Sequence, residues 1–73
     1  MKNPKLYVGL LGQVPKGEVV ENHKLEFVAS ENKEDAKEKL KLKWPKENVH
    51  IDGLKEVIEV DGYEIKLNKT KKK

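Results

Sequence analysis

Apolar and polar residues alternate over the C-terminal third of the chain, which predicts a β-hairpin. The pair Asp61-Gly62 lies between Val60 and Tyr63 and suits a two-residue type I′ turn, in which both central residues have positive φ. Counting outward pairs Val60 with Tyr63 and gathers the apolar side chains on one side, which we expect to face the core: Ile58, Val60, Tyr63, Ile65 and Leu67. An earlier pair, Asp52-Gly53, is consistent with a similar reversal or with a loop.

Two earlier segments have the pattern of strands. Residues 6–11 are apolar on both faces, which predicts a central strand. Residues 24–29 alternate and predict a second strand. The connection between them, residues 12–22, is long for a hairpin loop and contains three valines that need cover: Val14, Val19 and Val20.

A helix is predicted over residues 32–43. Ala36, Leu40 and Trp44 recur every four residues and form one narrow apolar stripe. Asn32 or Ser30 can cap its start, and acidic residues come early while lysines come late, as the helix dipole favours. The proline that follows Trp44 ends the helix. We expect Trp44 to anchor the core.

These elements predict one α+β domain over residues 1–67. Its expected architecture is an antiparallel sheet of four to five strands with one principal α-helix, in the order β-β-α-β-β(-β). A chain of 73 residues buries only about 60% of its extended-chain surface, so its stability margin is thin. A partner surface would add to that margin.

Composition narrows the function classes. The chain has no cysteine, which excludes disulfides, thiolate catalysis and thiolate metal sites and favours a reducing cytoplasm. Its N-terminal apolar run is too short for a secretory signal, and no stretch approaches the roughly 20 apolar residues of a membrane span. We therefore expect a soluble cytoplasmic protein without a membrane partner.

The basic charge is concentrated in a predicted disordered tail, residues 68–73. The formal net charge is +3; removing Lys69, Lys71, Lys72 and Lys73 leaves about −1 (3 − 4). All sixteen basic residues are lysine, so the planar fork that arginine offers to phosphate and guanine is missing. The tail can attract polyanions, but no specific nucleic-acid partner is expected.

Two polar pairs carry the candidate chemistry. Glu21 with His23, and His50 with Asp52, are each two residues apart and share a strand face. Together they could hold a divalent metal, or a histidine could act with a carboxylate as a general base. The alternative is structural: Asp52 serves a turn and each histidine makes a local hydrogen bond. Because spacing alone does not bring the pairs together, the structural interpretation is preferred, with no cofactor, metal or catalytic residue expected.

A homodimer is predicted from the first strand. One helix shields one face of a sheet, so the apolar side chains of the other face need cover by a second subunit. We assign to this interface Tyr7, Leu11, Val28 and Val57. In the competing interpretation, the three loop valines fold back over that face and the protein is a monomer.

Several segments occur together at a characteristic spacing. They are Glu21-Asn22-His23, a helix ending in Trp44, His50-Ile51-Asp52 and Val60-Asp61-Gly62-Tyr63. Over residues 6–67 the chain resembles a family of small bacterial proteins known only as a domain of unknown function. The resemblance implies no activity and no catalytic residues. Members often look like two tandem copies, which favours a two-fold pair of single copies here.

The function expected from the sequence is a non-catalytic assembly or protein-interaction module. The alternative is a domain that binds a small ligand or a metal through Glu21, His23, His50 and Asp52. An enzyme is less favoured, because one short chain would have to supply both the core and the site.

Overall fold

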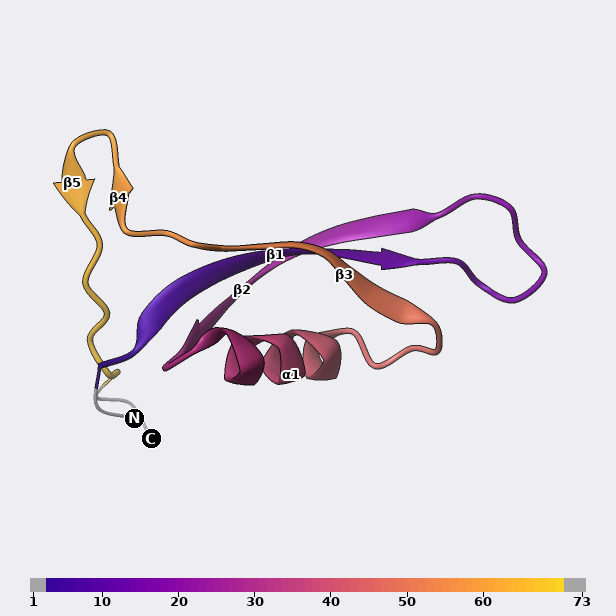
Figure 1. The fold of residues 1–73 in the computed structure, drawn as a ribbon, viewed down its shortest axis with the longest axis horizontal. Helices are drawn as coiled ribbons and strands as arrows, with labels where there is room; N and C mark the ends of the chain where they lie inside the picture. The colour runs from indigo at the N-terminus through magenta and orange to yellow at the C-terminus, as the bar shows by residue number, and fades with distance from the viewer. Residues whose placement is uncertain (1–2, 71–73) are drawn as a thin grey trace.

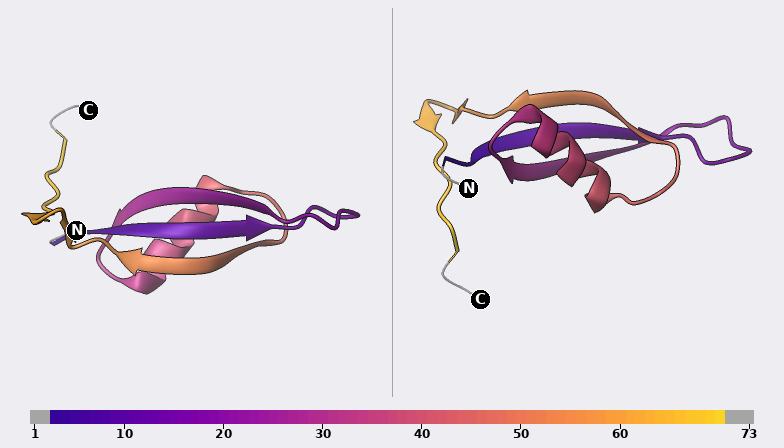
Figure 2. Two further views of the ribbon diagram at one scale, coloured as in Figure 1. Left: turned by 90° about the horizontal axis from the view of Figure 1, so that it is seen from above. Right: turned by 60° about the horizontal axis from the view of Figure 1, so that its bottom comes forward.

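The strand predicted over residues 6–11 is the middle of a three-stranded antiparallel sheet. The computed structural model describes residues 3–70. In chain order its elements are β1 (Lys5–Gln13), β2 (Asn22–Ser30), α1 (Lys33–Lys43), β3 (Val49–Glu56), β4 (Glu59–Val60) and β5 (Tyr63–Glu64). The sheet has the order β2-β1-β3, and α1 crosses one of its faces (Figures 1 and 2). The fold is α+β as predicted, but the strands form two sheets, since β4 and β5 stand apart as a small hairpin.

The helix follows the sequence prediction closely. The side chain of Asn32 caps it by accepting a hydrogen bond from the Asp35 N–H at 2.8 Å, and Trp44 is the C-terminal cap. Acidic residues lie in the first turn and lysines in the last, which complements the helix dipole. The helix has 11 residues. Within residues 3–70, no helix is long and apolar enough to cross a membrane.

The core lies between α1 and the face of the sheet that carries the odd-numbered residues of β1. Its buried members are Tyr7, Leu11, Val28, Ala36 and Leu40. Trp44 is half-buried and packs against this cluster together with Val49, Ile51 and Leu54. Three of the residues assigned to a dimer interface, Tyr7, Leu11 and Val28, are therefore covered by the chain's own helix, and the fourth, Val57, is half-buried just beyond β3.

Gly9 explains why the helix packs on this face. A Cβ atom added at Gly9 would overlap Leu40 Cδ1 and lie 3.3 Å from Leu40 Cγ. The missing side chain leaves the room that Leu40 fills. Leu6, Val8 and Leu10 stand on the other face, which the helix leaves uncovered. The sequence-based assignment of the interface face is therefore reversed.

The opposite face of the sheet is open. Leu25 and Phe27 of β2 are 65% and 54% exposed, beside Leu10 of β1. The loop between β1 and β2 extends beyond the ends of the strands (Figure 1), and Val19 at its end is 96% exposed. The loop valines therefore do not fold back over the sheet, as the alternative to the dimer required.

The C-terminal hairpin has the predicted register but a different environment. Val60 pairs with Tyr63, and the turn residues Asp61 and Gly62 have φ values of 54° and 85°, as a type I′ turn requires. Its apolar side does not join the core: Tyr63 is 76% exposed, and Ile58 and Val60 are also exposed. β3 remains paired with β1 as far as Glu56, so the hairpin projects past the sheet. Of the predicted tail, residues 68–70 contain no helix or strand, and residues 71–73 lie outside the described residues.

Three side-chain contacts attach α1 to β2. The Ser30 hydroxyl donates to Asp35 Oδ2 at 2.6 Å. Lys39 Nζ donates to the Ala29 carbonyl and Lys43 Nζ to the Phe27 carbonyl, both at 2.7 Å. The hydrogen bond from Ser30, followed by the hydrogen bond and charge of Lys39, lowers the pKa of Asp35 below its ordinary value of 3.8.

Leu40 and Gly9 should behave as a coupled pair in folding. Gly9→Ala should destabilise by about 1 to 3 kcal/mol through overpacking, and Leu40→Ala by about 2 to 5 kcal/mol through loss of buried area and the cavity it leaves. In the double variant the new methyl group occupies part of that cavity, so the loss should be smaller than the sum by about 1 kcal/mol. Urea denaturation measures all three. Additive losses would show that the two residues do not share this space.

Stability should depend on the charge of Asp35 at acidic pH. A lowered folded-state pKa means that its contribution is present above about pH 3.8 and is lost as pH falls through the folded value. Ser30→Ala should raise the pKa of Asp35, because the hydrogen bond from the hydroxyl is the largest single cause of the lowering, and Lys39→Met should raise it too. Carboxyl NMR titration measures both. No rise in Ser30→Ala would assign the effect to the lysine instead.

Candidate functional site

The two histidines flank one glycine on the open face of the sheet. Gly12 of β1 pairs with His23 of β2 on one side and with His50 of β3 on the other. Residues opposite one another in adjacent strands point to the same face. Antiparallel pairing of three strands therefore brings together two histidines that are far apart in the sequence.

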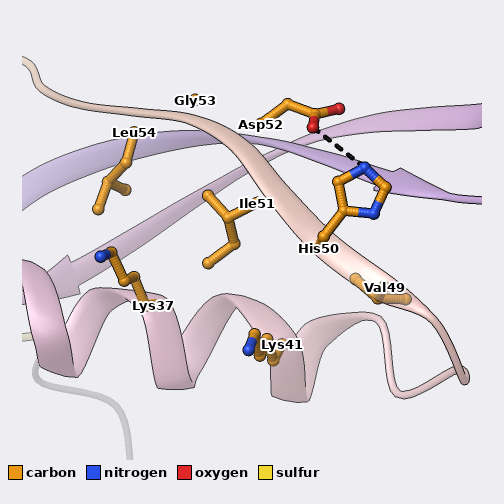
Figure 3. A pocket seen from close by; sticks show the side chains of 8 residues that line it. All are labelled: Lys37, Lys41, Val49, His50, Ile51, Asp52, Gly53 and Leu54. Atoms are coloured by element: carbon orange, nitrogen blue, oxygen red, sulfur yellow. Dashed lines mark ion pairs between the residues drawn. The ribbon is translucent and has the colours of Figure 1, made fainter.

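The carboxylates enter from a loop and from a β-bulge. Glu21 precedes β2 by one residue. In β3 the register shifts, so that Leu10 pairs with Gly53 and Leu11 with Ile51, which leaves Asp52 as the extra residue. Figure 3 shows Ile51 pointing toward α1, whereas Asp52 and His50 point away from it.

The predicted reversal at Asp52-Gly53 is therefore wrong, because the chain stays in β3 through this pair. The bulge meets two packing demands at once: it keeps Ile51 and Leu54 on the helix side while Asp52 stays on the open face. The structural role assigned to Asp52, a turn residue, is replaced by a place in the cluster.

All four side chains meet above Gly12. His50 Nε2 lies 2.6 Å from Glu21 Oε2 and 3.0 Å from Asp52 Oδ1. His23 Nε2 lies 3.4 Å from Asp52 Oδ2 and 3.7 Å from Glu21 Oε1. Three of the residues, Glu21, His50 and Asp52, each place one donor atom within 4.8 Å of the donor atoms of the other two. We refer to these four residues as the His-carboxylate cluster.

Gly12 supplies the space in which the cluster meets. A Cβ atom added there would overlap Glu21 Oε2, and would lie 2.6 Å from Asp52 Oδ2 and 2.8 Å from His50 Nε2. Only glycine lets Glu21 reach across the central strand to His50. The role of Gly12 was not predicted from the sequence. The available signal was its position directly after the predicted strand, residues 6–11, which is apolar on both faces.

The contacts in the cluster lie at ion-pair distance between histidine and carboxylate. Glu21 Oε2 is buried and accepts no hydrogen bond within the described part of the chain, although His50 Nε2 lies beside it. Close carboxylate partners for both histidines are consistent with the structural interpretation of these residues as well as with a ligand role.

The cluster is accessible from solvent. The side chains of His23 and His50 are 48% and 49% exposed, and those of Glu21 and Asp52 are each 33% exposed. Solvent thus reaches both imidazoles, although Glu21 Oε2 itself is buried. Two imidazole nitrogens and two carboxylates form a donor set suited to zinc, manganese or another first-row divalent metal.

No curated protein and no solved structure matches this chain significantly. A family model described as Domain of Unknown Function (DUF1543) matches residues 18–67. The match includes β2, α1, β3 and the C-terminal hairpin, and with them all four members of the His-carboxylate cluster. Since the matched region is more than half of the 73 residues, the chain belongs to the DUF1543 family of domains of unknown function.

Proposed function

We propose that the domain binds one divalent transition-metal ion through Glu21, His23, His50 and Asp52. The observation that carries the proposal is the convergence of two histidine nitrogens and two carboxylates above Gly12, where the buried Glu21 Oε2 accepts no hydrogen bond within residues 3–70. This role replaces the sequence-based preference for independent structural roles. It is a binding role, and no reaction is assigned to it.

The distances fit a single ion. Two atoms that are each about 2.1 Å from a tetrahedral zinc ion lie about 3.4 Å apart. Glu21, His50 and Asp52 each offer one donor atom within 4.8 Å of the other two. A rotation of the His23 side chain, whose Nε2 lies 3.4 Å from Asp52 Oδ2, would add the fourth ligand. The like charges of the two carboxylates also favour a cation between them.

Metal binding would join three parts of the fold. Glu21 is at the end of the long loop, His23 is in β2, and His50 and Asp52 are in β3. An ion held by all four ties both outer strands across the central one. Because the unfolded chain lacks this arrangement, binding energy contributes to folding.

Zinc or manganese should raise the melting temperature of the metal-free protein. At a free-ion concentration about 100 times Kd, binding adds about 2.7 kcal/mol, which corresponds to a rise of roughly 10 to 20 °C for a domain of this size. His50→Ala and Glu21→Gln should each lose most of the rise, while Glu59→Gln in the distant hairpin should retain it. Absence of a rise in the wild-type protein at millimolar zinc and manganese would reject the proposal.

Two glycine variants test whether the space above Gly12 is needed for metal binding when all four ligands are present. Gly12→Ala keeps all four ligands but places a methyl group among them, so it should abolish the metal-dependent stabilisation. Gly53→Ala is the matched control on the same face, because its Cβ meets only Leu10 Cβ, at an ordinary 3.8 Å. Equal metal response in the two variants would show that the space above Gly12 is not the binding site.

We propose as a second function that two copies associate through the open face of the sheet. Apolar side chains cover much of this face, with Leu25 and Phe27 more than half exposed beside Leu10. The helix lies on the other side (Figure 1), and Val19 and Val20 of the loop are 96% and 66% exposed. Lys55 of β3 pairs with Val8 on this face, so two copies meet favourably in an arrangement that keeps their Lys55 side chains apart. The interface differs from the one predicted from the sequence, since it uses the even-numbered residues of β1.

Light scattering across a dilution series should show a two-chain mass that falls to one chain on dilution. Phe27→Lys should shift the protein to one chain at all concentrations, because it places a charge in the apolar face. Val19→Lys makes the same chemical change at a loop position away from that face and should leave the association intact. A one-chain mass for the wild type at millimolar concentration would exclude the dimer.

A further inference from the structure

The helix α1 hydrogen-bonds to the backbone of one outer strand of the sheet, β2, and leaves a groove beside the other, β3. Along β2, the side chains of Lys39 and Lys43 donate to the carbonyls of Ala29 and Phe27 at 2.7 Å. These bonds occupy backbone acceptors on that edge and protect it from pairing with another strand. Along β3, no further strand is paired in residues 3–70. The β3 edge therefore offers free backbone hydrogen-bonding groups.

A groove runs between the β3 edge and α1. Its apolar wall consists of Val49, Ile51 and Leu54, which are only partly buried. Its helix side carries Lys37 and Lys41 (Figure 3). The groove has a volume of about 380 Å³, which is room for several side chains.

The two lysines of the groove differ from those facing β2. Lys39 and Lys43 have partners, and Lys39 also lies 3.4 Å from Asp35. The side chains of Lys37 and Lys41 make no hydrogen bond or ion pair within residues 3–70. Two uncompensated cations thus stand beside a free strand edge and an apolar wall.

We propose that the β3 edge binds an extended acidic segment of a partner protein, which adds to the sheet as a fourth strand. Glutamates two residues apart in a strand project on the same side and are separated by about 6.6 Å. Lysines four residues apart on a helix are about 6 Å apart at Cβ. A Glu-x-Glu segment therefore places its methylene groups against Ile51 and Leu54 and its carboxylates at Lys37 and Lys41.

A second copy of this chain fits the edge less well. Two-fold pairing of β3 with β3 would bring the helices of both copies side by side, with Lys37 and Lys41 of each facing the same lysines of the other. Such like-charge contacts oppose association. An acidic partner removes this repulsion and completes the backbone hydrogen bonds, which is the usual energetics of strand addition.

The test is NMR titration of the full chain with the capped peptide Thr-Glu-Val-Glu-Val-Glu-Thr. Amide shifts should be confined to β3 and to the helix around Lys37 and Lys41. The double variant Lys37→Glu/Lys41→Glu should bind about tenfold more weakly or worse. The double variant Lys16→Glu/Lys66→Glu makes an equal change of net charge elsewhere on the surface and should bind as the wild type does.

Two peptide controls separate strand addition from charge attraction. A peptide with lysine in place of each glutamate should not bind. The acidic peptide N-methylated at two consecutive central amides, one facing each edge of the strand, should lose binding although its charge is unchanged. Retained binding of the methylated peptide, shifts centred outside β3, or no binding of the acidic peptide would each overturn the proposal. Concentration-dependent shifts along β3 that persist without peptide in Phe27→Lys, where association through the open face is removed, would instead assign the edge to a second copy and would also overturn it.

Discussion

The central strand β1 (Lys5–Gln13) carries two glycines on opposite faces. The hydrophobic core depends on the space left by one of them, and the His-carboxylate cluster depends on the space left by the other. On one face, the absence of a side chain at Gly9 lets Leu40 approach the sheet, which seats the helix and closes the core. On the other face, the absence of a side chain at Gly12 lets Glu21 reach His50. Close approach to a backbone is a physical use of glycine that compensates for its cost within a strand.

The position of the helix then decides which surfaces remain available. The contacts of Lys39 and Lys43 hold the helix toward β2. The helix therefore covers β3 only partly on this face, and Ile51 and Leu54 border a groove. A single 11-residue helix leaves the opposite face of a three-stranded sheet uncovered. A small domain cannot avoid such surfaces, since it has too few elements to bury every face. The apolar face and the open edge follow from this shortage.

The bulge at Asp52 connects the core with the His-carboxylate cluster. In a regular strand, side chains alternate strictly, and a shift of one residue would exchange the two faces. The extra residue lets Ile51 and Leu54 both pack toward α1 while His50 and Asp52 share the open face. The same irregularity therefore satisfies the hydrophobic core and positions a carboxylate beside a histidine, as bulges near functional sites commonly do.

The sequence by itself determined the local elements. The spacing of Ala36 and Leu40 and the cap at Asn32 predicted the helix, and Asp61-Gly62 predicted the hairpin turn and its register, because both depend on interactions within a few residues. Only the tertiary structure decided which face of β1 meets the helix, since alternation shows two apolar faces but not the gap at Gly9. It also decided that Glu21, His23, His50 and Asp52 meet, because their contact requires the register of three strands and a bulge. The hairpin's apolar side shows the same limit: local pattern predicted its shape, but whether it reached the core depended on how far β3 stays paired with β1.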